Sequence, residues 1–259
     1  MELDQNDLRD LKKAKLLLEN PSLAAKLTNL IGTPIEKGFE LLPNHWNAKI
    51  GEITQTSLTK AIHAAVFTMK NTPSEESSNK WHKLIVASSG GVGGFFGLAA
   101  LVIELPVSTT IMLRSIADIA RSEGENIVTD QAKLACIEVF ALGGPTLNDD
   151  ASESGYFVVR AALAKSFTEA AEYIAERGLA DEGAPALVRF IIQVAERFGI
   201  LVSEKAAAQA IPALGAVGGA IINTLFIDHF QDMARGHFIV RRLERKYGTE
   251  LVKQAYNNI

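Results

Sequence analysis

The sequence predicts an all-α fold, a multi-helix globular bundle with two Gly-rich apolar helical segments packed centrally. Apolar residues recur every three or four positions, and no segment shows the strict alternation of a half-buried strand. Glycine and proline pairs divide the chain into helix-sized pieces. Two long apolar runs, residues 84–113 and 211–227, carry closely spaced glycines, and Glu104 is the only charge between Leu84 and Leu113.

Residues 1–79 are predicted to form an N-terminal helical region that ends in a linker. Helices are expected over residues 4–18 and 57–69, and a further one begins at Asn20-Pro21, with Asn20 as its cap and Pro21 in its first turn. Residues 71–79 are polar and aperiodic and contain a proline. They mark the predicted boundary with a second helical domain over residues 80–259.

The second domain is predicted to be a series of helices separated by glycine and proline. They are expected at 80–87, 92–105, 107–122, 129–142, 156–177, 184–198, 203–210 and 228–247, the last one continuing from the second apolar run. Pro106 is expected to bend or end a helix because proline lacks the amide donor that the helix interior needs. Gly248 is expected to end the long C-terminal helix.

Glycines four residues apart in the apolar runs lie on one helix face and let a second helix approach closely. A helical glycine costs about 1 kcal/mol against alanine, so close packing must offset that cost. The predicted helix-packing positions are Gly90, Gly94, Gly97, Gly215 and Gly219. Three interpretations of the runs stay open: helices buried in a soluble bundle, an apolar face lying on a membrane, and transmembrane hairpins. A mean hydropathy of +0.12 favours the first.

The net charge of −4 argues against nucleic acid as a partner. The single cysteine, Cys136, lies among apolar residues and is expected to be a small buried hydrophobe in a reducing compartment. The N-terminus is acidic and polar, unlike a secretory leader. The expected location is therefore the cytoplasm, with the inner face of the cell membrane as the place of peripheral contact. The basic end of the long C-terminal helix is the feature that would touch anionic lipid.

The candidate polar site comprises charged and amide side chains of the two apolar runs and of the helices that continue them. Its members are Glu104, Arg114, Asp118, Asn223, Asp228, His229, Asp232, His237 and Arg241. Glu104 needs a cation or donor because an unpaired buried carboxylate is costly. Arg114 is one expected partner of Glu104, and a pair between Arg114 and Asp118 along one helix face is the other. The simplest interpretation is a polar network that fixes the helix register.

A metal site is the alternative interpretation of these residues. Carboxylates and imidazoles three or four residues apart hold metals in helical bundles, and Asp228, His229 and Asp232 have that spacing. The spacing is generic, however, and the segment lacks a zincin motif. We therefore expect no bound metal and no cofactor. Phosphate loops, dinucleotide fingerprints and nucleophile elbows are also missing from the sequence.

Several long segments in order resemble the EcsC family. The first is GGVGGFFGLAALVIELPVSTTIMLRSIADIARSEGE, and the others are EVFALGGP, ESGYFVVRAALAK and IPALGAVGGAIINTLFIDHFQDMARGHFIVRRLERKYG. Together they span most of the chain from Trp81 to Gly248. The resemblance implies a bacterial protein, in a family whose name comes from a member encoded beside the ATPase and membrane subunits of an ABC transporter. It supplies no catalytic residues to transfer.

Three functions follow as expectations. The first is a non-enzymatic accessory protein that acts at a membrane surface or with a membrane transporter. The second is a metal-dependent hydrolase that uses the carboxylate and histidine cluster. The third is a lipid-binding module with an apolar pocket between the helices. The sequence sets no oligomeric state.

Overall fold

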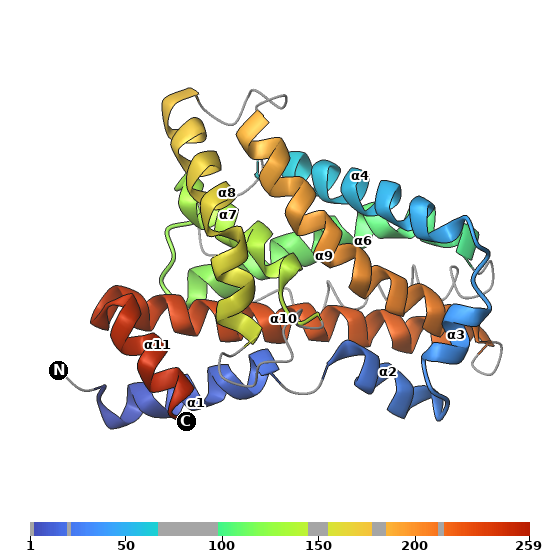
Figure 1. The fold of residues 1–259 in the computed structure, drawn as a ribbon, viewed down its shortest axis with the longest axis horizontal. Coiled ribbons are helices and arrows are strands. Elements are labelled where there is room, and N and C mark those ends of the chain that lie inside the picture. The colour runs from blue at the N-terminus through green and yellow to red at the C-terminus, as the bar shows by residue number, and fades with distance from the viewer. Residues whose placement is uncertain (1–2, 20–21, 67–97, 145–154, 178–184, 212–214) are drawn as a thin grey trace.

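The computed structural model describes residues 3–19, 22–66, 98–144, 155–177, 185–211 and 215–259 (Figure 1). All regular structure in these ranges is helical, which confirms the predicted all-α fold. The helices are α1 (Gln5–Glu19), α2 (Leu23–Ile31), α3 (Glu36–Glu40), α4 (Trp46–Val66), α6 (Leu98–Ser122), α7 (Asp130–Glu138), the 3₁₀ turn η1 (Val139–Ala141), α8 (Gly155–Arg177), α9 (Pro185–Ala210), α10 (Gly215–Tyr247) and α11 (Thr249–Asn257).

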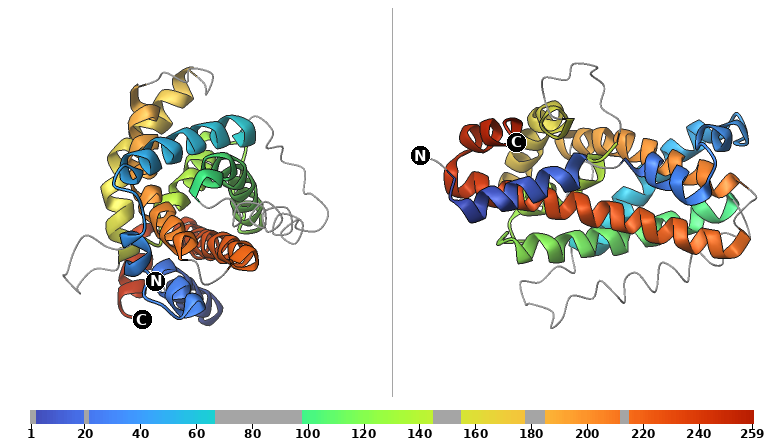
Figure 2. Two further views of the ribbon diagram at one scale, coloured as in Figure 1. Left: turned by 90° about the vertical axis from the view of Figure 1, so that its right-hand side faces the viewer. Right: turned by 90° about the horizontal axis from the view of Figure 1, so that it is seen from below.

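Helix α10 is the long axis around which the other helices pack. Helix α1 lies along its C-terminal half, α6 lies beside it, and α9 crosses it and joins it to α4 and α8 (Figures 1 and 2). The N-terminal helices thus pack directly on the later ones. The predicted domain boundary at residues 79 and 80 lies outside the described residues, so that division stays a prediction.

Helices α6 and α10 pack side by side and run in the same direction. The side-chain amide of Gln231 donates to the hydroxyl of Ser115 at 2.9 Å, and the guanidinium of Arg241 donates to Glu125 at 2.7 Å. Both contacts join residues 116 positions apart. Nζ of Lys205 lies 2.5 Å from Glu104 of the first run and 4.9 Å from the ring centroid of Phe226 of the second, so described parts of the two apolar runs are neighbours, as predicted. Of the helix-packing glycines, Gly219 is buried in α10 and Gly215 begins that helix, whereas Gly90, Gly94 and Gly97 lie outside the described residues.

The helix end predicted at Pro106 is wrong, because α6 runs through this proline from Leu98 to Ser122. The proline removes the amide that would donate to the carbonyl of Val102, and hydroxyl groups of the next turn donate to other carbonyls of the helix. Thr109 donates to the carbonyl of Leu105 at 2.7 Å, and Thr110 donates to the carbonyl of Pro106 at 2.8 Å. Likewise, the two helices expected over 184–198 and 203–210 are one helix, α9.

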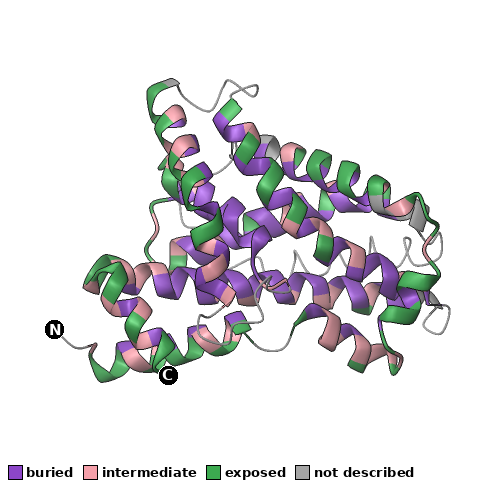
Figure 3. Ribbon diagram, viewed as in Figure 1, coloured by how far each residue is buried: buried purple, intermediate pink, exposed green. Residues whose placement is uncertain are grey.

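The buried residues are concentrated along α10 and where α9 and η1 pack on it (Figure 3). Four phenylalanines from these elements pack with ring centroids 4.9–6.1 Å apart: Phe140, Phe198, Phe226 and Phe230. Cys136 is fully buried, and burial raises the pKa of its thiol to about 12, as expected for a small hydrophobe. The polar groups described next are set into this apolar interior.

Candidate functional site

Glu104 is paired with a lysine that the sequence analysis did not identify. Its Oε1 atom lies 2.5 Å from Nζ of Lys205 on α9, and both side chains are buried, with Lys205 0% exposed. The ammonium group also lies 4.9 Å from the ring centroid of Phe226 on α10. Three helices thus meet at this ion pair. The spacing of Phe198, Leu201, Val202 and Lys205 places Lys205 on the buried face of α9, and this is the signal that would have revealed it.

Arg114, the expected partner of Glu104, is exposed on α6 and does not supply the buried charge. The reason is helical geometry: the two residues lie ten positions apart on one helix, about 15 Å along its axis. Glu104 Oε2 has no hydrogen-bond partner among the described residues. The pair therefore holds a carboxylate whose desolvation is only partly offset. Asp118 pairs with Arg121 at 2.6 Å, one turn farther along α6.

His229 lies near the middle of α10, buried against the turn that follows η1. Neither ring nitrogen has a hydrogen-bond partner among the described residues. Desolvation, helped by the charge of Lys26, lowers the pKa of the imidazole to about 3, so the ring is neutral. The backbone of Gly143, at φ +77°, lies so close that a side chain there would collide with the His229 ring. The imidazole therefore acts as a packing group.

The three metal candidates on α10 do not converge. His229 is buried, whereas Asp228 and Asp232 are partly exposed, and Asp232 pairs with Lys26 at 3.5 Å and Arg235 at 3.2 Å. In the part of the chain that the structure describes, no three His, Cys, Asp or Glu side chains gather where they could hold a metal ion. The ligand set of the metal-dependent alternative is thus not assembled within those residues.

His237 belongs to a different cluster, the Glu138–His237–Tyr156 triad, which joins α7, α10 and α8. Nδ1 of His237 lies 3.0 Å from the Tyr156 hydroxyl, and Nε2 lies 3.6 Å from Glu138 Oε2. Arg160 donates to the same hydroxyl oxygen at 3.2 Å and makes a two-point ion pair with Glu244 at 2.8 and 3.0 Å. All three members of the triad are buried.

The direction of the hydrogen bonds in this triad follows from Arg160, which can only donate. The Tyr156 oxygen accepts from Arg160, so its own hydrogen is free to point at Nδ1 of His237. That assignment leaves the imidazole proton on Nε2, facing Glu138. Desolvation raises the pKa of Glu138 and lowers that of His237 well below its usual value, so burial favours the neutral form of each group.

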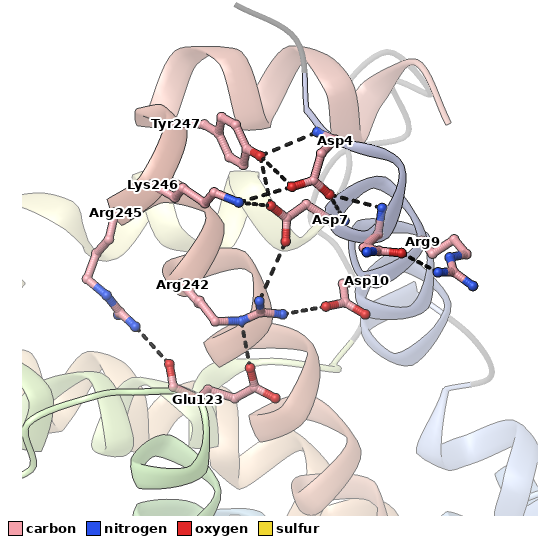
Figure 4. A network of polar contacts seen from close by, with 10 residues as sticks. Asp4, Asp7, Arg9, Asp10, Glu123, Arg242, Arg245, Lys246 and Tyr247 are labelled. Carbon is pink, nitrogen blue, oxygen red and sulfur yellow. Dashed lines mark hydrogen bonds and ion pairs between the residues drawn. The ribbon is translucent and has the colours of Figure 1, made fainter.

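The basic end of α10 is neutralised by acids from α1 and from the turn after α6 (Figure 4). Arg242 contacts Asp7 at 3.6 Å, Asp10 at 2.6 Å and Glu123 at 2.9 Å. Arg241 and Arg245 share Glu125, and Lys246 bridges Asp4 and Asp7. The cations expected to face anionic lipid are instead committed within the protein, so the electrostatic argument for membrane contact is weakened.

The candidate residues therefore form several separate sites along α10. Glu104 of α6 lies near Phe226 in the first half of α10, because Lys205 contacts both residues. His229 lies near the middle of α10, and His237 and Arg241 lie toward its C-terminal end. His229 and His237 are eight residues apart, about 12 Å at 1.5 Å per residue. Asn223 is buried on α10 one turn before Phe226. Such an arrangement is that of interhelical polar contacts rather than one reaction centre.

The family assignment rests on the length of chain that one family model matches. The model of the EcsC protein family matches residues 5–243 of the 259-residue chain. The chain belongs to the EcsC protein family. The match begins in α1, so it includes the N-terminal helices as well as most of the segments between Trp81 and Gly248 that resemble the family. Comparisons with curated proteins and with solved structures gave no match. None of the described helices combines the length and the apolarity needed to cross a membrane.

Proposed function

We propose that this EcsC-family protein is a non-enzymatic accessory protein that lies on a membrane surface. The observation that carries the proposal is an exposed apolar face at the start of α6, formed by Val102, Ile103 and Val107. Ile103 is 77% exposed, and the other two are 40% and 49% exposed. Contiguous exposed aliphatic residues on a helix are typical of interaction surfaces rather than of a solvated face.

Helix α10, which packs on α6, carries a further exposed aliphatic side chain near its own start, Ile221. Ile221 is itself 41% exposed. We name the four side chains, Val102, Ile103, Val107 and Ile221, the apolar face. Glu104, which follows Ile103 in α6, is buried and pairs with Lys205 of α9, so this ion pair holds the inner side of α6.

A lipid bilayer is the occupant that best fits the apolar face. The sequence from Leu84 to Ile103, which leads directly into it, contains no ionisable side chain. The basic cluster at the other end of α10 is already paired with acids, so contact with lipid would be apolar rather than electrostatic. Shallow burial of one apolar helix face at the headgroup boundary is a known mode of reversible membrane binding.

Sedimentation with vesicles tests the proposal. The full chain is expected to sediment with neutral phosphatidylcholine vesicles, and moderate salt should weaken binding little because few charges take part. The Ile103→Asp/Val107→Asp variant should lose at least about 10-fold in affinity, since each charge must be desolvated at the interface. Leu16→Asp is the matched control, because Leu16 is 63% exposed on α1, away from the face.

Three results would contradict the proposal. One is that the wild-type protein stays in the supernatant at all lipid concentrations. Another is equal loss in the control and the test variant. The third is sedimentation with native membranes that disappears after those membranes are treated with protease, because that result would identify a membrane protein as the partner in place of lipid.

A further inference from the structure

Helix α11 covers the aromatic side of the Glu138–His237–Tyr156 triad. Its Tyr256 ring stacks on the Tyr156 ring with centroids 5.9 Å apart and meets Phe157 edge-on at 5.1 Å. Tyr256 and Tyr156 are both buried by these contacts. The side chain that closes the triad from this side thus comes from the last helix of the chain.

Helix α11 is held by fewer buried residues than the other helices around the triad, with cation–π contacts of Lys15 to Tyr256 and of Lys253 to Phe157 in addition. The helix has nine residues, of which Val252 and Tyr256 are buried, and a helix of this length is unstable alone. Gly248, at φ +86°, separates it from α10, and no side chain caps its first turn. Lys15 of α1 donates to the carbonyl of Tyr256 at 2.9 Å, which ties down the end of the helix. Few buried contacts mean a low cost of local opening.

The polar contacts given above for the triad are made without α11. Its members come from α7, α8 and α10, and the two-point ion pair of Arg160 with Glu244 fixes Arg160 beside the Tyr156 oxygen. Carboxyl, imidazole and hydroxyl groups lie in a row, the order that activates a hydroxyl in other proteins, and the imidazole is hydrogen-bonded to the hydroxyl while its Nε2 lies 3.6 Å from the carboxyl, beyond hydrogen-bond distance. Here α11 separates it from solvent on one side.

We propose that α11 is a lid that opens without unfolding the rest of the bundle and gives solvent and small hydrogen-bonding ligands access to Tyr156. This inference concerns a different part of the molecule and does not depend on membrane binding. In the closed state burial keeps the proton on Tyr156, because desolvation raises the pKa of the phenol and lowers that of His237. Opening readmits water and relieves this desolvation, and the phenolic proton then passes to Nδ1 of His237. The products are a phenolate beside the Arg160 guanidinium and an imidazolium beside Glu138, so no other reactant is required.

Hydrogen exchange of the unmodified full chain is the first test. Amides of 250–257 are expected to exchange at least about 100-fold faster than those of 231–243, which hold His237. The two segments should also respond differently to mild denaturant, because local opening exposes little surface. Equal protection in both segments would overturn the proposal, since α11 would then open only when the whole protein unfolds.

Chemical modification of tyrosine is the second test. Tetranitromethane nitrates tyrosine through its phenolate, and the chain has four tyrosines that peptide mapping can distinguish. Tyr256→Ala and Lys15→Met each remove part of the attachment of α11 and should raise nitration of Tyr156 by about 10-fold relative to Tyr173. Gln254→Ala, at an exposed position of the same helix, is the matched control and should leave the ratio unchanged.

The pH dependence of Tyr156 nitration tests whether His237 accepts the phenolic proton. In the Tyr256→Ala background, His237→Gln should move the midpoint of Tyr156 nitration upward by about one pH unit, because the proton acceptor is lost. Tyr173 serves as the internal reference and should not move. If Tyr156 is no more reactive in the weakened variants, or if its profile ignores His237, the lid-and-triad proposal is wrong.

Discussion

The two ends of α10 are stabilised in different ways. At the C-terminal end, exposed and half-buried arginines and lysines pair with acids from α1 and the turn after α6. At the N-terminal end, the Glu104–Lys205 pair is closed off from water and lies under exposed aliphatic residues. The largest group of ion pairs around α10 thus lies at one end of the helix, and the exposed aliphatic residues lie at the other.

This difference predicts unequal energetics for similar contacts. An exposed pair gives up little hydration and is screened by salt, so its loss changes stability slightly. A buried pair has lost its hydration on folding, so removing one partner leaves an uncompensated charge. The number of ion pairs at an end is therefore a poor guide to how much each contributes.

Loss of Lys205 is expected to have the largest effect. Lys205→Met should lower the free energy of unfolding by about 3–5 kcal/mol, because Glu104 stays buried without its cation. Adding Glu104→Leu should restore most of this loss, since a well-packed apolar pair of similar volume carries no desolvation cost. Denaturant titration measures both variants, and a loss below about 1 kcal/mol in the single variant would contradict the burial of the pair.

A pH dependence is expected next, from Glu204, the neighbour of Lys205. Desolvation raises the pKa of this carboxyl from 4.5 to about 7, partly offset by the backbone N–H of Ala24. A raised pKa in the folded state means that its contribution is fully present below pH 4.5 and is lost as pH rises through 7. Glu204→Gln should equal wild type near pH 4.5 and be more stable at pH 8 by at most about 3 kcal/mol.

Glu196→Gln, at an exposed site on the same helix, is the control for that measurement. Its stability curve should follow that of the wild type across the range. A wild-type stability that does not fall between pH 5 and pH 8, or a Gln variant that follows it in parallel, would show that Glu204 is solvated.

Close backbone contacts allow a third comparison of the ends. A methyl group at Gly38 of α3 would overlap the carbonyl oxygen of Ala207 on α9. At Gly236 it would lie 2.6 Å from Cγ of the Leu18 side chain of α1 and 3.0 Å from the backbone oxygen of Ala14, a looser backbone contact than at Gly38. Gly38→Ala is expected to lower the free energy of unfolding by about 1–3 kcal/mol, and Gly236→Ala by less, because a side chain yields more easily than backbone. Thermal unfolding of both variants would test the order.

The smallest effect is expected within the exposed network. Arg242→Gln should cost about 1 kcal/mol or less, and the difference should shrink in molar salt as the charges are screened. Arg114→Ala should be similarly mild, because Arg114 is exposed rather than buried beside Glu104 as the sequence analysis expected. A loss at Arg242 that is large and insensitive to salt would remove the distinction between the ends.

Helix periodicity and breakers were enough to predict the all-α fold and the pairing of the two apolar segments. They failed at Pro106 and at the gap expected between residues 198 and 203, because a helix that is packed on both sides can run through a poor helix former. The need of Glu104 for a cation was predictable from its apolar neighbours. The partner was not, because sequence proximity favoured Arg114, whereas the fold brings Lys205 from α9, 101 positions away.

The candidate site was predicted least well, again for a spatial reason. Asp228, His229, Asp232, His237 and Arg241 are close in sequence, but successive residues of a helix point in different directions and each meets a different neighbour. Glu138, Tyr156 and Arg160 complete the cluster around His237 and were not identified, because they lie on α7 and α8. Only the packing of those helices on α10 brings the three groups to the imidazole.

Both termini emerge near the charged end of the bundle (Figure 1). A fluorescent reporter or a surface tether joined to either terminus would therefore sit away from Ile103 and Val107. Protein immobilised in this way would present the apolar face outward, which is the orientation that a single-molecule test of the proposed lipid contact requires.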